Sequence, residues 1–240
     1  MAEASEKRKS DFGLPFIQEV SFLRSLPSLL QKELCDHSDF LRFSEKEIIF
    51  QEGDNPVGGF IVATGYVVMM KKTFKKRDFV TELLGSHEPF GMVSAVHGEP
   101  YPLGAEVLRE SVVFRIHQDY LAYLSRKEPE FVHSILALCR SRLMNSHKSI
   151  AHLADASSKV RIAHALLLAA RAFCSHYGFS FDESAHIDVT RDEVSRIAGT
   201  TVETCIRVTR SFEDQGILEF PASKHILIVK PKMLSQICEI

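Results

Sequence analysis

Cysteine is scarce in this sequence and follows no pattern. The five cysteines of the 240 residues, at positions 35, 139, 174, 205 and 238, are scattered and odd in number. No two of them have the Cys-x-x-Cys spacing of a zinc ribbon or a redox pair, and an odd set does not indicate a disulfide framework. We therefore predict no metal site, and free thiols that are typical of a cytoplasmic protein.

Long apolar runs are absent as well. No stretch approaches the roughly 18 consecutive apolar residues that indicate a membrane-spanning helix, so no membrane partner is expected. The opening MAEASEKRKSDFG is charged and lacks the apolar core of a secretory signal. We expect residues 1–15 to be a disordered lead-in.

The motifs of common enzymes are also missing. The sequence has no Gly-x-Ser-x-Gly, P-loop, His-Glu-x-x-His or Gly-x-Gly-x-x-Gly motif, and we predict neither catalytic residues nor an enzyme. The formal net charge is −2, so the charge of the whole chain does not indicate a nucleic-acid partner. Any attraction to phosphate groups has to come from a local basic face.

What the sequence does contain is a helix-turn-helix pattern in residues 190–212, TRDEVSRIAGTTVETCIRVTRSF. Thr190 can cap a first helix, with the glutamate three residues later as the second half of a capping box. Gly199 supplies a tight turn, and Thr200 or Thr201 can cap a second helix. Two helices joined by a short turn with glycine have the shape of a DNA-reading motif.

The second helix carries residue types that suit base edges. Arg207 can bond both acceptors of a guanine, and Glu203, on the same face, can accept from a cytosine amino group. The alternative interpretation is an exposed ion pair between Glu203 and Arg207. A strand LEF, a turn at 221–223 and a strand HILIV follow directly. They predict a wing, which favours the DNA interpretation.

These residues resemble the signature of the CRP/FNR family of bacterial transcription regulators, and the string TVET is more similar to the FNR branch. The signature residues are Thr190-Arg191, Gly199, Glu203-Thr204 and Arg207. Ile206 stands where that branch has serine, so the outer bases of the half-site stay open. The resemblance implies a palindromic TTGA-like site. The DNA-binding residues that it implies are Thr201, Val202, Glu203, Thr204, Arg207, Arg210 and Arg191. Of these, Arg210 and Arg191 are assigned to phosphate contacts.

Residues 43–116 consist of short β-branched and aromatic runs, which are typical of a β-sandwich or barrel. The runs are EIIF (47–50), GFIVA (59–63), YVVMMKK (66–72), FVTELL (79–84), GAEVL (104–108) and SVVFRI (111–116). FIVATGYVVM resembles the cyclic nucleotide-binding jelly roll of the same family. The five cations of KKTFKKRD (71–78) are expected at a solvated hairpin tip.

Helical periodicity frames these strands. Residues 16–41 predict one or two short helices with an apolar stripe that reaches Phe40, and residues 118–127 predict a helix that ends before Pro129. From Glu130 to Ala154, apolar residues alternate by four and three, which predicts a seam between paired helices. A helix packed on its own barrel is the alternative, and the resemblance implies a dimer helix. The seam residues are Val132, Leu136, Cys139, Leu143, Ser146, Ile150 and Leu153.

The resemblance also implies an effector pocket, in residues 89–107. In members that bind cAMP, this stretch has a glutamate for the ribose and an arginine for the phosphate. Met92 and Leu103 stand at those positions and cannot make the contacts, so we predict no cAMP binding. A lone N-terminal cysteine does not predict an iron–sulfur cluster. The effector is unknown, with haem on a histidine left open. The candidate pocket residues are Met92, His97, Leu103, Ser146 and His147.

The sequence therefore predicts an α+β chain in three parts. We expect a jelly-roll sensor domain at 16–128, a dimerisation helix at 129–156 and a winged helix-turn-helix domain at 157–240, with a hinge at 155–158. The chain would bind double-stranded DNA as a homodimer and contact RNA polymerase. The alternative is a regulatory subunit that uses the jelly roll to bind a ligand, although it leaves residues 190–229 unexplained.

Overall fold

The computed structural model describes residues 13–72, 78–155, 157–174, 179–222 and 224–238. Residues 1–12 of the expected lead-in and residues 73–77 of the basic hairpin tip lie outside this range. The prediction of disorder is wrong for the last residues of the lead-in, because residues 13–19 are helical. The side chain of Phe16 in that helix is buried in the core, which fixes the segment.

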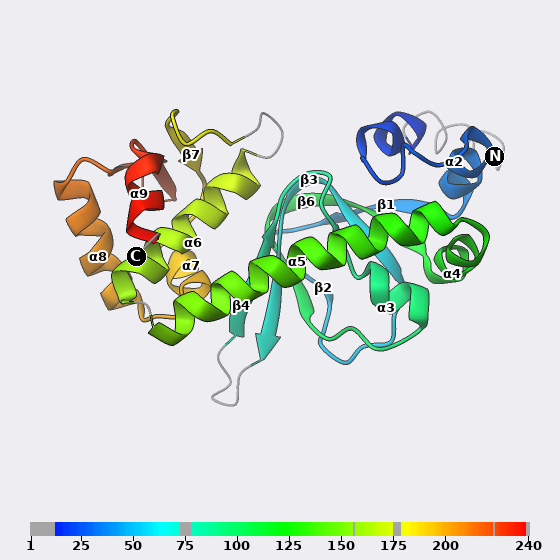
Figure 1. Cartoon of the computed structure of the whole chain (residues 1–240), viewed down its shortest axis with the longest axis horizontal. Helices are drawn as coiled ribbons and strands as arrows, with labels where there is room; N and C mark the ends of the chain where they lie inside the picture. The colour runs from blue at the N-terminus through cyan, green and yellow to red at the C-terminus, as the bar shows by residue number, and fades with distance from the viewer. Residues whose placement is uncertain (1–12, 73–77, 156, 175–178, 223, 239–240) are drawn as a thin grey trace. The chain divides into compact units, whose positions relative to one another are not determined.

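A six-stranded sheet forms the centre of the N-terminal half (Figure 1). The strand order is β1-β6-β3-β4, with β2 paired to β6 and β5 paired to β3, and the pairs of β6 with β1 and β2 and of β3 with β5 are antiparallel. This jelly-roll-like sheet confirms the β structure that was predicted for residues 43–116. The strands are β1 (Ser38–Phe43), β2 (Ile48–Phe50), β3 (Gly58–Lys72), β4 (Asp78–Leu84), β5 (Pro89–Phe90) and β6 (Gly104–His117).

Two of the predicted breaks between strands do not occur. The runs 59–63 and 66–72 form the single strand β3, and the runs 104–108 and 111–116 form the single strand β6. Gly65 bends β3 with φ +88° where a side chain would collide with Ser111 of β6. The Ser111 hydroxyl accepts a hydrogen bond from the Tyr66 amide at 3.0 Å. Thr64-Gly65 is therefore a bend within a strand, not a turn.

The helical segment predicted for residues 16–41 extends too far toward the C-terminus. Helix α2 (Ser28–Asp36) stops before Ser38, and residues 38–43 pair with β6 as strand β1. Phe40 lies opposite Phe114, with ring centroids 4.9 Å apart. The partner strand is far along the sequence, so local periodicity gave no signal for this pairing.

Helices cover this sheet and share its core. α3 (Met92–His97) was not predicted, whereas α4 (Gln118–Lys127) and α5 (Pro129–Asp155) correspond to the helices predicted at 118–127 and 130–154. The core joins α2 and α4 to the first turns of α5 through Leu34, Leu121, Phe131 and Ile135. The Tyr120 hydroxyl of α4 donates to the Leu30 carbonyl of α2 at 3.3 Å.

The C-terminal part is a small helical unit with a three-stranded sheet in the order β7-β9-β8. Ser157 caps its first helix by accepting from the Val160 amide at 3.4 Å. The elements are α6 (Ser158–Phe173), β7 (Ala185–Ile187), α7 (Arg191–Ile197), α8 (Val202–Asp214), β8 (Leu218–Ala222), β9 (His225–Ile228) and α9 (Pro231–Cys238).

The chain divides into two compact units whose limits differ from the predicted domains. One unit comprises residues up to Val67 with Ser86–Met144, and the other comprises Val68–Gly85 with the chain from Asn145 onward. The strand segment 68–85 belongs to the second unit because β4 contacts α6 and α7 there. No helix among the described residues is long and apolar enough to cross a membrane.

Candidate nucleic-acid interface

The two helices of the predicted motif begin at the expected caps. The Thr190 hydroxyl accepts from the Glu193 amide at 3.2 Å, and the Glu193 carboxylate accepts from the Thr190 amide at 2.7 Å. This capping box starts α7, and Gly199, with φ +59°, makes the turn that follows. Of the two candidate caps for α8, Thr201 is the one whose hydroxyl accepts from the Thr204 amide, at 3.3 Å. The predicted helix-turn-helix is confirmed.

One face of α8 is anchored in the domain. Cys205, Thr209 and Phe212 are fully buried, and Val208 is nearly so. Burial raises the pKa of the Cys205 thiol to about 11, so this group packs as a small apolar side chain at neutral pH. The Thr209 hydroxyl donates back to the Cys205 carbonyl at 2.8 Å, which satisfies a polar group that would otherwise be costly to bury.

The opposite face of α8 carries the predicted DNA-reading side chains. Glu203, Arg207 and Arg210 are exposed, and Thr204 and Ile206 are half-buried. In Figure 1, α8 lies at one edge of the helical unit. Six of its side chains line an open hollow along the helix: Glu203, Ile206, Arg207, Arg210, Ser211 and Asp214. An exposed helix face with a carboxylate and two guanidinium groups suits hydrogen bonding in a major groove.

Arg191, predicted to contact phosphate, is held within the protein. Its Nε donates to the hydroxyl of the buried Thr209 of α8 at 3.1 Å. Its guanidinium carbon also lies 3.6 Å from the centroid of the Phe220 ring of β8. One side chain at the start of α7 therefore ties α8 to strand β8 of the wing. Sequence reasoning missed this role, because the partners are 18 or more residues away and no local pattern marks them.

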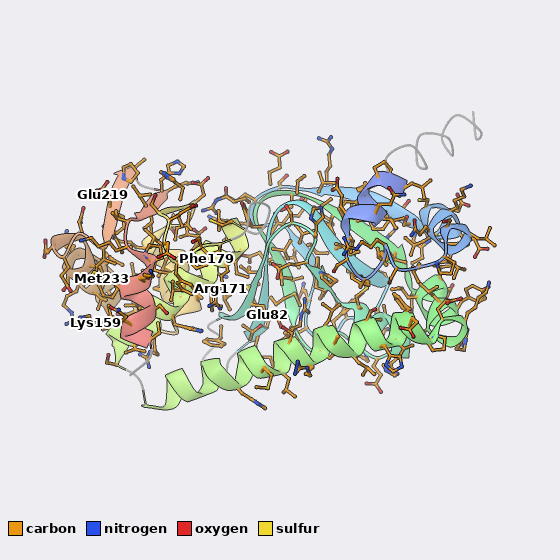
Figure 2. The ribbon with its side chains drawn as sticks, turned by 45° about the horizontal axis from the view of Figure 1, so that its top comes forward. Glu82, Lys159, Arg171, Phe179, Glu219 and Met233 are labelled. Carbon is orange, nitrogen blue, oxygen red and sulfur yellow. The ribbon has the colours of Figure 1, made fainter. Side chains whose placement is uncertain are left out.

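The predicted wing is the hairpin β8–β9. Leu218 pairs with Ile228 and Ala222 with His225, with a register shift between Glu219 and Ala222. Figure 2 marks Glu219, an exposed residue of β8 next to Phe220. On β9, His225 contacts Asp188, which follows β7. The wing is thus fixed to the unit on both of its strands.

The predicted dimer helix has two apolar faces. Phe131 and Ile135 of α5 are buried in the core of their own unit. Leu136 and Leu143 are 57% and 55% exposed, and Met144 is 50% exposed. Of the other predicted seam residues, Val132 and Cys139 are half-buried, Ser146 is exposed, and the side chains of Ile150 and Leu153 lie outside the description. One face of the helix therefore packs on its own unit, as in the alternative interpretation, and the pairing of the exposed face with a second helix stays a prediction.

The stretch predicted to hold an effector is packed by aromatic rings. Tyr101 is 1% exposed and stacks on Phe50, with ring centroids 3.8 Å apart. Its hydroxyl donates to the Gly58 carbonyl at 2.6 Å, and burial raises the pKa of this phenol. Phe60 and Phe90 are also buried, with ring centroids 5.3 Å apart. The four rings pack against one another, and two of them, Phe90 and Tyr101, belong to residues 89–107.

The candidate effector residues differ in how deeply they are buried. Met92 is 5% exposed and belongs to the hydrophobic core, so its thioether is a packing group. Leu103 is half-buried, and His97 is exposed at the end of α3. Ser146 and His147 are exposed on α5. Among the residues that the structure describes, no group of three or more histidine, cysteine, aspartate or glutamate side chains could hold a metal ion.

Comparisons with known proteins agree with this geometry. Residues 40–128 match the cyclic nucleotide-binding domain, and residues 160–237 match the Crp-like helix-turn-helix domain. The chain is 24% identical to electron transport regulator A of Shewanella oneidensis over 90% of its own length and 82% of that protein. It is 28% identical to the transcriptional activator protein anr of Pseudomonas aeruginosa, over 75% of this chain and 73% of that one.

A solved structure shows the same fold. FixK2 from Bradyrhizobium japonicum superimposes with a TM-score of 0.72 at 19% identity, covering 83% of this chain and 96% of that chain.

Proposed function

The chain belongs to the CRP/FNR family of DNA-binding transcription regulators, and on this premise we propose that it reads a palindromic, TTGA-like site as an effector-controlled homodimer. The observation that carries the proposal is the exposed face of α8. Glu203 and Arg207 stand there on a helix that is capped, buried on its other side and tied to the wing by Arg191. Such a rigid support holds side chains where base edges require them.

In the proposed complex, α8 enters the major groove. Arg207 donates to O6 and N7 of a guanine, and Glu203 accepts from the amino group of the paired or neighbouring cytosine. Thr201, Val202 and Thr204, at the start of the helix, approach the base edges or the adjoining backbone. Arg210 is exposed and is assigned to a phosphate, whereas Arg191 is assigned to a phosphate and to the support of α8.

The proposed dimer forms through α5. The side chains of Leu136, Leu143 and Met144 are each at least 50% exposed. The other face of the helix is already packed on its own unit. Pairing the exposed face with a second copy removes apolar surface from water. A two-fold dimer then presents two α8 helices to successive major grooves, about 34 Å apart, and this geometry matches a palindrome.

The effector is proposed to act through the jelly-roll unit, and the surroundings of residues 89–107 argue against cAMP. Met92 is buried and Leu103 carries no charge, so neither offers the polar contacts that a ribose and a cyclic phosphate need. Haem ligated by His97 or His147 is the effector that the sequence leaves open. Absorption spectra of the purified wild type, His97→Ala and His147→Ala proteins with added haem test that ligation.

A gel shift on a palindromic TTGA duplex tests the DNA proposal. We expect the wild type to shift this duplex and not a duplex in which both central G·C pairs are changed to A·T. The absence of any shift, together with copurification of another chain, would instead indicate a ligand-binding regulatory subunit. We further propose that the protein works in the cytoplasm and contacts RNA polymerase, and transcription of a template that carries the site tests the second point.

A further inference from the structure

Ile206 is an apolar residue in the middle of the proposed reading face. It lies between Glu203 and Arg207 along α8 and lines the same open hollow. Its neighbours Cys205, Val208 and Thr209 are buried, whereas Ile206 itself is only half-buried. Part of an apolar side chain is therefore presented among charged side chains on the face that is proposed to enter the groove.

The backbone around Ile206 is held in place. The Thr209 hydroxyl lies 3.2 Å from the Ile206 carbonyl and 2.8 Å from the Cys205 carbonyl. The same hydroxyl accepts from Arg191. A β-branched side chain in a helix has essentially one χ1 rotamer. Its direction is therefore set before DNA binds, and no ordering of the side chain is needed on binding.

The chemistry of the groove leaves one type of partner for this side chain. Isoleucine has no hydrogen-bond donor or acceptor, and the apolar group that a base pair presents in the major groove is the C5-methyl of thymine. We propose that Ile206 is a specificity-determining residue that reads this methyl group, in the base pair adjacent to the G·C pair bound by Arg207. This inference rests on the proposed function and assigns one further position of the half-site.

Replacing thymine by deoxyuridine in a selected duplex tests the inference directly. The exchange removes only the methyl group and keeps base pairing. Each thymine of the half-site, on either strand, is replaced in turn in both halves of the palindrome. For the wild type, we expect one position next to the G·C pair to lose about fourfold in affinity per half-site, the value of one buried methyl group.

Variants of Ile206 separate this contact from an effect of deoxyuridine on the duplex itself. Ile206→Ser should bind the thymine and deoxyuridine duplexes equally, and Ile206→Val, which keeps two methyl groups, should retain the loss. Because each variant is compared with itself on two duplexes, a general loss of stability does not affect the ratio. Arg207→Ala should weaken binding to both duplexes and leave their ratio unchanged.

Three results would overturn the inference, and they can be told apart. If the wild type selects a palindrome that depends on Arg207 but no adjacent thymine is sensitive, Ile206 does not read a methyl group and the proposed function stands. If Ile206→Ser keeps the sensitivity, another residue makes the contact. If the wild type selects no duplex, the proposed function and this inference fall together.

Discussion

Two regions of the molecule differ in the side chains that they expose. On α8, the signature residues Glu203 and Arg207 are exposed. In residues 89–107, Met92 is buried in the core and Leu103 is half-buried. Each stretch lies in a domain that matches the family. In α8, packing on one face supports polar chemistry on the other. In residues 89–107, Met92 packs in the apolar core, at the position where the resemblance implies a carboxylate in members that bind cAMP. The shared fold therefore extends to both regions, while, of the two, α8 alone presents polar signature side chains on an exposed face.

Met92→Glu should have the largest effect, because it tests whether this position is core or pocket. A carboxylate placed in the apolar core should lower the free energy of unfolding by on the order of 3 kcal/mol or more. Urea denaturation measures this value, and Leu103→Arg, at a half-buried position, should cost much less. If calorimetry instead detects micromolar cAMP binding by the wild type, residues 89–107 do form a nucleotide site, and the contrast with α8 is wrong.

Leu143→Glu should remove the proposed dimer and leave α8 untouched. An unpaired charge in an apolar interface costs on the order of 3 kcal/mol, and a symmetric dimer contains two of them. Light scattering should therefore report a monomer. Val93→Glu is the matched control, because Val93 is also an exposed apolar side chain, 46% exposed on α3. An unchanged dimer for Leu143→Glu would remove this residue from the seam.

Arg191→Ala tests the support of the reading helix. Loss of the hydrogen bond to Thr209 and of the contact with the Phe220 ring should lower the free energy of unfolding by about 1–2 kcal/mol. Urea unfolding followed by circular dichroism measures the change. Arg171→Ala removes a looser arginine–ring contact, 5.8 Å from Phe181, and should change stability much less. Equal stability of Arg191→Ala and the wild type would show that the contacts with Thr209 and Phe220 do not stabilise the domain.

Arg210→Ala should have the smallest effect and should act on binding alone. As a phosphate contact, Arg210 should strengthen binding to all sequences alike, and its loss should reduce the slope of log affinity against log salt by about 1. Its stability should equal that of the wild type. Arg126→Ala, which removes an exposed arginine of α4, serves as the control for a change in net charge. An unchanged salt slope would exclude Arg210 from the interface.

The elements that could be predicted from the sequence are those fixed by neighbours along the chain. The caps Ser157, Thr190 and Thr201 bond backbone amides three residues away, so their spacing alone identifies them. The long helix α5 and the wing hairpin were predicted for the same reason, since periodicity and turn residues are local signals.

Features that depend on distant partners were missed. Strand β1 exists because Phe40 and its neighbours pair with β6, which comes more than sixty residues later in the chain. Gly65 stays within β3 because Ser111 of β6 bonds the backbone of Tyr66. Arg191 supports α8 through Thr209 and Phe220, and the sequence assigned it only to phosphate. In each case a tertiary contact decides between local alternatives that the residues alone allow.

Binding-site selection from random duplexes, with the wild type and Arg207→Ala side by side, tests the central claim most directly. We expect the wild type to return a palindrome with a G·C pair in the core of each half-site. Arg207→Ala should cost about 1–3 kcal/mol per half-site and lose its preference at that pair. If no such palindrome is selected, or if Arg207→Ala keeps full discrimination, α8 is not the reading helix.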